Sequence, residues 1–195
     1  MNLYQKTRPL QAGYSMIEVL VTLVILMLGL LGLVGLMLLS QRSEMESYQR
    51  AQALVLLQDL AGRINANRTA APCYAITTDT VNGTPYLGVS SSVTPSCSSG
   101  SVEAYTLANN DLTAWNNLLT GTAEQSGTAN LGAMIGARGC ISFDSASGTY
   151  LVSIAWQGNG KTAAPGSGLS CGKGLYGDET MRRVVSMPLQ IANLN

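Results

Sequence analysis

The sequence predicts an α+β protein, in which a long N-terminal α-helix packs on a small antiparallel β-sheet head. Three observations carry this prediction. Residues 14–39 form an apolar run with a single charged side chain, Glu18. The segment that follows keeps apolar residues at helical spacing, and the last third of the chain holds strand-like runs separated by turns. A length of 195 residues leaves room for one domain and an anchor.

The apolar run is long enough to cross a membrane. At ~1.5 Å per residue it makes a helix of roughly 39 Å, against a hydrocarbon core of about 30 Å. Lys6 and Arg8 precede it, and positive charges hold that end in the cytoplasm, so the rest of the chain is expected outside. A secretory signal would have a shorter apolar region. A plain single-pass anchor would leave Glu18 unexplained, because a carboxylate inside such a helix indicates a functional partner.

This N-terminus resembles the class III signal of type IV pilins and pseudopilins. The resemblance lies in a short basic leader, Gly13, the aromatic Tyr14, and Glu18 five residues after the glycine, followed by the apolar helix. It implies that a prepilin peptidase removes residues 1–13 and methylates the new amino terminus at Tyr14. It also implies that Glu18 pairs with the methylated amine of a neighbouring subunit, so that residues 14–39 serve first as a transmembrane helix and later as filament core.

Three glycines, Gly29, Gly32 and Gly35, lie within the apolar run. Small residues let membrane helices approach closely, and each glycine weakens a helix by roughly 1 kcal/mol relative to alanine. We therefore expect a helix-packing face here. Local loosening of the helix when it leaves lipid is the second interpretation.

Residues 40–70 are expected to continue the helix as an amphipathic half that ends near Asn67, before Pro72. Its apolar positions recur at three- and four-residue spacing: Leu54, Leu57, Leu60, Ala61 and Ile64. The stretch 50–68 resembles the second half of the helix in the minor pilin family named PilV. Because pilin signals are shared by many families, this stretch carries the narrower resemblance.

Residues 71–195 are expected to form a periplasmic globular head that holds all four cysteines: Cys73, Cys97, Cys140 and Cys171. An even number of cysteines in an oxidising compartment suggests two disulfides, with three connectivities open. We favour Cys73 with Cys97, which staples the Ser-, Thr-, Gly- and Pro-rich section 72–104 as a loop or a pair of weak strands. Cys140 with Cys171 would tie loop 157–180 to a hairpin.

Within the head, Asp111 is a suitable N-cap for a short helix over residues 112–120, closed by Gly121. Trp115 lies on the inner face of that helix and is expected in the core. The spacing of Asp111 and Trp115 also resembles PilV-like minor pilins.

Two strand-like runs, 140–143 and 150–156, are separated by a short polar turn and predict an antiparallel hairpin. Tyr150, Val152, Ile154 and Trp156 alternate with smaller residues, so this face should pack on the long helix. A last strand is expected over 182–191, where Pro188 would place it at an edge or end it.

Together these features predict a minor pilin, a structural subunit that helps to prime or initiate type IV pilus assembly within the tip complex and so supports twitching motility and adhesion. The resemblance implies prepilin peptidase, other minor pilins, the major pilin and a tip adhesin as partners. The chain would be a single-pass inner-membrane protein before it enters the extracellular pilus.

Two other functions share parts of this pattern. A type II secretion pseudopilin has the same N-terminus, although such proteins tend to have smaller heads and fewer cysteines. A filament-displayed adhesin or DNA-binding module would need a ligand site. The whole chain has 11 basic and 11 acidic residues, which gives no general electrostatic reason to bind nucleic acid. The one basic group to consider is Lys161, Lys173, Arg182 and Arg183.

An enzyme is not expected. The chain has no histidine, no nucleophile motif and no phosphate-binding glycine loop. The adjacent carboxylates Asp178 and Glu179 fit a solvated turn. Without histidine and without cysteine pairs at ligand spacing, neither a metal site nor a cofactor is expected.

Overall fold

The computed structural model describes residues 13–191 apart from 92, 124, 128 and 131–133. Lys6 and Arg8 therefore lie outside the described residues. The chain divides into two compact units, Met1–Glu44 and Met45–Asn195. The division falls within the helix α1, which extends over Met16–Ala66, close to the helix that the sequence predicts.

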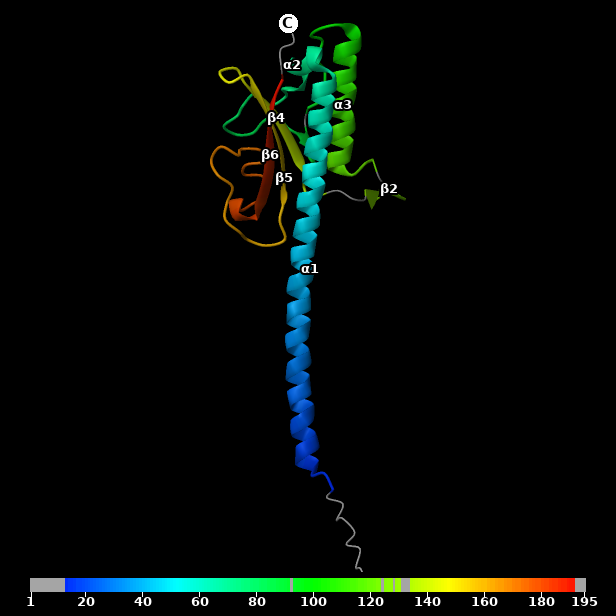
Figure 1. Ribbon diagram of the computed structural model, residues 1–195, viewed down its shortest axis with the longest axis vertical. Coiled ribbons are helices and arrows are strands. Elements are labelled where there is room, and N and C mark those ends of the chain that lie inside the picture. The colour runs from blue at the N-terminus through cyan, green and yellow to red at the C-terminus, as the bar shows by residue number, and fades with distance from the viewer. Residues whose placement is uncertain (1–12, 92, 124, 128, 131–133, 192–195) are drawn as a thin grey trace, which may run out of the picture. The chain divides into compact units, whose positions relative to one another are not determined.

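The second unit is a helix-and-sheet head with the elements shown in Figure 1. A 3₁₀ turn at Arg68–Ala70 and the short helix α2, Ala71–Tyr74, follow α1. The helix α3 covers Val102–Thr120. The strands are β1 Leu87–Gly88, β2 Gln125–Ser126, β3 Ala129–Asn130, β4 Arg138–Asp144, β5 Thr149–Gln157 and β6 Arg182–Gln190, with a 3₁₀ turn at Glu179–Met181 before the last.

The main sheet is antiparallel and has the order β1-β4-β5-β6. The predicted hairpin is β4 and β5, in which Phe143 lies opposite Tyr150. The predicted last strand is β6, which pairs with β5 and forms an edge. Pro188 lies in β6, where the missing N–H of proline is tolerated because an edge strand has a neighbour on one side only. Strands β2 and β3 form a separate two-stranded sheet.

The core lies between the inner face of the sheet and two helices, the Met45–Ala66 part of α1 and α3 (Figure 1). Val152, Ile154 and Trp156 of β5 belong to the same buried cluster as Leu57 and Leu60 of α1. This confirms that the alternating face of the strand packs on the helix. Because the inward positions of β5 are spaced by two and those of α1 by three or four, each periodicity buries one continuous face.

Trp115 is fully buried, as the sequence predicts. Its indole Nε1 donates a hydrogen bond of 3.1 Å to the carbonyl oxygen of Leu56, which ties α3 to α1. On its other side the indole lies against the backbone of β4 at Gly139, where a Cβ atom would collide with the ring carbons of Trp115. Glycine at this position therefore lets the tryptophan fill the space between helix and sheet.

The prediction of a short helix capped by Asp111 was wrong. Helix α3 begins at Val102, and Ser101 is its N-cap, with Oγ accepting a hydrogen bond from the N–H of Ala104. Asp111 lies inside the helix and is 7% exposed. An aspartate inside a helix costs some intrinsic propensity, and its tertiary partners outweigh that cost here. The C-terminal end is as predicted, because Gly121 closes α3 in the left-handed conformation.

Section 72–104 is partly as expected. It contains an isolated bridge between Asp79 and Thr84 and the two-residue strand β1, Leu87–Gly88. A loop joins the bridge to the strand. The last residues of the section belong to α3. The turn at 79–84 is closed by the Asp79 carboxylate, which accepts hydrogen bonds from the backbone N–H groups of Val81 and Asn82.

Candidate assembly site

The N-terminal residues that the sequence singles out lie at the beginning of α1. Tyr14 precedes the helix and is 86% exposed. Glu18 lies in the first turn, and its backbone N–H donates to the carbonyl oxygen of Ser15 at 3.0 Å. A carboxylate in a first turn is favourable because the helix dipole places positive potential there. No basic side chain among the described residues forms an ion pair with Glu18.

The side chains that follow Glu18 are apolar and exposed. The most apolar 18-residue window of α1 has a mean hydropathy of 2.9, and none of it is buried. Leu26, for example, is 61% exposed and Leu36 66%. A surface of this kind is stable only against lipid or other apolar helices. Helix α1 is thus long and apolar enough to cross a membrane, which by itself fits a signal sequence as well as an anchor.

Gly29, Gly32 and Gly35 have open space around them, because a Cβ atom built at any of the three would meet no other atom within 4 Å. Within one chain these glycines are therefore not required by packing. Their role as a helix-packing face stays a prediction about contacts with other chains.

The four cysteines form two disulfides, Cys73 with Cys97 and Cys140 with Cys171. The first closes the loop between α2 and α3, where Asn109 also holds Cys97 by hydrogen bonds to its backbone N–H and carbonyl oxygen. The second joins β4 to loop 157–180. No cysteine of the described chain is free, and no cluster of three or more potential metal ligands occurs among the described residues.

A partly buried polar network connects α1, α2 and α3, and the sequence did not reveal it. Arg63 donates to Asp59 and to Asp111, each at 2.9 Å. The hydroxyl of Tyr74 donates to the other oxygen of Asp111 at 2.6 Å. Asn67 donates to Tyr74 and to the carbonyl oxygen of Ala104. Burial, with the bond to Asp111, raises the pKa of Tyr74 above its ordinary value, so the phenol remains a donor across the physiological range.

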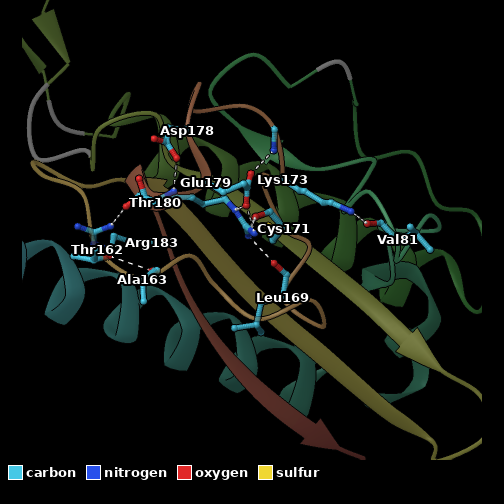
Figure 2. A network of polar contacts seen from close by, with 12 residues as sticks. Val81, Thr162, Ala163, Leu169, Cys171, Lys173, Asp178, Glu179, Thr180 and Arg183 are labelled. Carbon is cyan, nitrogen blue, oxygen red and sulfur yellow. Dashed lines mark hydrogen bonds and ion pairs between the residues drawn. The ribbon is translucent and has the colours of Figure 1, made fainter.

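A second network organises loop 157–180 (Figure 2). Arg182 is 3% exposed. Its guanidinium pairs with Glu179 at 2.6 Å and donates to the carbonyl oxygens of Leu169 and Cys171. Arg183 pairs with Glu46 of α1 at 2.8 Å. The contacts of Arg182 therefore hold the loop against the sheet, and the ion pair of Arg183 with Glu46 links this part of the head to α1.

These contacts bear on two features that the sequence singled out. The basic group is not a free cationic stripe, because Arg182 and Arg183 are neutralised and Lys161 pairs with Asp178 at 2.8 Å. Lys173 donates to the carbonyl oxygen of Val81 (Figure 2). Asp178 and Glu179 lie at a turn with partly exposed side chains, as the sequence predicts, and each also pairs with a basic side chain. The sequence shows that Asp178 and Glu179 are close to Arg182 and Arg183 along the chain. It does not show that Lys161 pairs with Asp178 and Arg182 with Glu179.

Comparison with known proteins gives the class of the chain. Residues 8–34 match the family described as "Prokaryotic N-terminal methylation motif". Neither curated proteins nor solved structures match the chain significantly. The motif marks type IV pilin-like proteins and pseudopilins, which are structural proteins without catalytic function.

The long apolar N-terminal helix and the four-stranded antiparallel sheet that follows it are the pilin-like α+β fold. The chain is therefore a type IV pilin-like or pseudopilin subunit. The motif implies processing by a prepilin peptidase and assembly with pilins, and the apolar helix is consistent with anchoring in the inner membrane before assembly.

Proposed function

We propose that the chain is a minor pilin of the PilV family that helps to prime or initiate assembly of a type IV pilus and belongs to its tip complex. The observation that carries this proposal is the combination of two features: an exposed Glu18 in the first turn of α1, which pairs with no basic side chain of the described residues, and a large head closed by two disulfides. The PilV-like stretch 50–68 supports the narrower family.

In this proposal residues 1–13 are the leader and 14–39 become filament core. Residues 40–70 carry the head, 71–195. The prepilin peptidase cuts after Gly13, and the methylated amine of Tyr14 neutralises Glu18 of a neighbouring subunit. Because an unpaired carboxylate among packed apolar helices costs several kcal/mol, cleavage and docking are coupled.

Other minor pilins and the major pilin are the proposed partners, with a tip adhesin bound at the end of the filament. The chain is held as a single-pass inner-membrane protein with its head in the periplasm, and it then passes into the extracellular pilus. Twitching motility and adhesion depend on it because both require pili.

The test compares a deletion strain with the same strain complemented by the full chain. A minor pilin predicts few pili and little twitching in the deletion strain, restoration by complementation, and the chain in the sheared-pilus fraction. Normal pili together with a defect in protein secretion would assign the chain to a type II secretion system. Normal pili, normal secretion and lost surface attachment would indicate an adhesin.

A further inference from the structure

Arg138, at the beginning of β4, is a buried cation on the face of the sheet that loop 157–180 covers. It is 8% exposed. Side chains two residues apart in a strand share a face, so Arg138 lies on the same side as Cys140, whose disulfide partner Cys171 belongs to that loop. The residues around Arg138 form a small second cluster, separate from the main core.

Two tyrosine rings enclose the guanidinium of Arg138. Its Cζ atom lies 5.5 Å from the ring centroid of Tyr86 and 4.9 Å from that of Tyr176. Nη1 donates to the carbonyl oxygen of Gly136 at 3.1 Å, and the hydroxyl of Tyr176 donates to the same oxygen at 2.9 Å. We call Arg138, Tyr86, Tyr176 and Gly136 the Arg138 cage. The cage holds the guanidinium in one orientation.

One nitrogen of the guanidinium has no acceptor among the described residues. Nε is buried and makes no hydrogen bond. Nε and Nη2 lie on one edge of the planar guanidinium, which is the edge that pairs with a carboxylate when arginine binds one side-on. An acceptor that reaches Nη2 would therefore also compensate the dipole of Nε.

Arg138 also lacks a counter-charge, in contrast to the other arginines of the polar networks described above. Arg63, Arg182 and Arg183 each lie within 2.9 Å of a carboxylate oxygen. No carboxylate of the described residues pairs with Arg138. Burial raises the pKa of Tyr176, so this ring remains a neutral phenol. Cation–π contacts stabilise the arginine in part, but a desolvated cation without an anion is costly.

Two exposed apolar residues lie next to members of the cage in the chain. Ile135 precedes Gly136 and is 49% exposed, and Leu175 precedes Tyr176 and is 42% exposed. Exposed apolar residues beside a fixed arginine and tyrosines are typical of interface hot spots, in which Tyr and Arg are enriched and the charged group is desolvated on binding. The fixed geometry also favours binding, because little side-chain entropy is left to lose.

We propose that the Arg138 cage docks an Asp or Glu side chain of a neighbouring pilin subunit, and that this contact orients the head beside its partner. The proposal rests on the proposed assembly with pilins and adds a specific contact in the head. A protein carboxylate fits better than a small anion because the exposed apolar residues Ile135 and Leu175 adjoin Gly136 and Tyr176 in the chain, and an incoming protein surface would cover them.

The test replaces the guanidinium with an amine that can be trapped. Cells producing the full chain with Arg138→Lys are treated with a zero-length carbodiimide, which activates a carboxylate so that a contacting amine forms an amide bond with it. Peptides from the sheared-pilus fraction are then sequenced by mass spectrometry. The expected product joins residue 138 to an Asp or Glu of another pilin. Arg138→Gln, which has no amine, is the matched control and should give no such product.

The variants also separate a docking role from a structural one. We expect Arg138→Lys and Arg138→Gln to reach wild-type levels in the membrane with both disulfides formed. Entry of Arg138→Gln into the sheared-pilus fraction should fall on the order of tenfold, while Arg138→Lys should retain more. Normal entry of folded Arg138→Gln would overturn the proposal, as would amide products of Arg138→Lys confined to its own chain.

A second experiment keeps Arg138. It applies if the Arg138 variants do not accumulate in the membrane. A photo-reactive residue at position 135, in place of the exposed Ile135, should crosslink to a pilin peptide that contains Asp or Glu. Incorporation of this chain without such a crosslink would also overturn the proposal. The proposed function is tested separately by the wild-type chain. If the wild-type chain is absent from the sheared-pilus fraction, the proposal of a minor pilin is refuted, and not only the proposal for the cage.

Discussion

The hydroxyl of Tyr74 donates a hydrogen bond of 2.6 Å to the Asp111 carboxylate, inside the head and between α2 and α3. The other carboxylate oxygen accepts from Arg63 of α1, so one buried aspartate joins three helices. Both partners lie far from Asp111 in the sequence, Arg63 by 48 positions and Tyr74 by 37. These two bonds explain why an aspartate is tolerated in the middle of α3. We therefore expect the network to contribute to the free energy of unfolding of the head.

The first prediction concerns this network. Tyr74→Phe keeps the ring but removes the donor to Asp111, which leaves a buried carboxylate oxygen without its partner. Losing a hydrogen bond to a charged acceptor should lower the free energy of unfolding by about 1–3 kcal/mol. Urea unfolding of the purified full chain in detergent measures it. Tyr105→Phe is the control, since Tyr105 packs beside the core and makes no hydrogen bond with its hydroxyl among the described residues. Equal stability of both variants would contradict the role of the network.

Several elements were predictable because their signals are local. The helix α1, the β4–β5 hairpin and the glycine end of α3 follow from periodicity and turn chemistry over short stretches. Asp111 was misread because a polar residue before an apolar run looks like a cap, whereas its function depends on Tyr74 and Arg63. The processing and assembly roles of Gly13, Tyr14 and Glu18 stay predictions that rest on the motif. The Arg138 cage could not be predicted, because nothing in the sequence shows that Tyr86 and Tyr176 meet on either side of one arginine.

A second prediction concerns the crosslinks. Non-reducing peptide mapping should recover Cys73 with Cys97 and Cys140 with Cys171, and no free thiol. The chain-entropy model gives ~3 kcal/mol for the first loop, whose cysteines are 24 residues apart. Cys73→Ser with Cys97→Ser should therefore lower the unfolding free energy by about this amount and leave the second disulfide intact. Recovery of any other pairing would contradict the folded head described above.

A third prediction follows from the pKa of Asp178. The hydrogen bond from Lys161, with a further bond from the backbone N–H of Thr180, lowers this pKa to about 2. A depressed carboxyl pKa contributes stability above the unfolded value, near 4, and the contribution is lost as the pH falls toward 2. NMR titration of the Asp178 carboxyl should show the low midpoint in the wild type. In Lys161→Gln the midpoint should rise toward 4. An unchanged midpoint in Lys161→Gln would show that the ion pair does not form in solution.

A fourth prediction concerns processing. Mature protein from cells should begin at Tyr14 and carry one added methyl group, which intact-mass measurement detects. Gly13→Leu should block cleavage, because the motif places the cut after a glycine. Mature protein that retains Lys6 and Arg8 would be incompatible with assembly, since these charges could not enter a packed apolar filament core.

The central claim is that Glu18 of one subunit selects the processed amino terminus of another. The most direct measurement is the amount of this chain in the sheared-pilus fraction relative to the membrane fraction, for wild type, Glu18→Asp and Glu18→Gln. The account predicts normal cleavage and membrane levels for all three, a fall on the order of tenfold or more for Glu18→Gln because the neighbouring amine loses its partner, and a smaller fall for Glu18→Asp. Incorporation of Glu18→Gln at the wild-type ratio would contradict it and leave a membrane-anchored head as the better description.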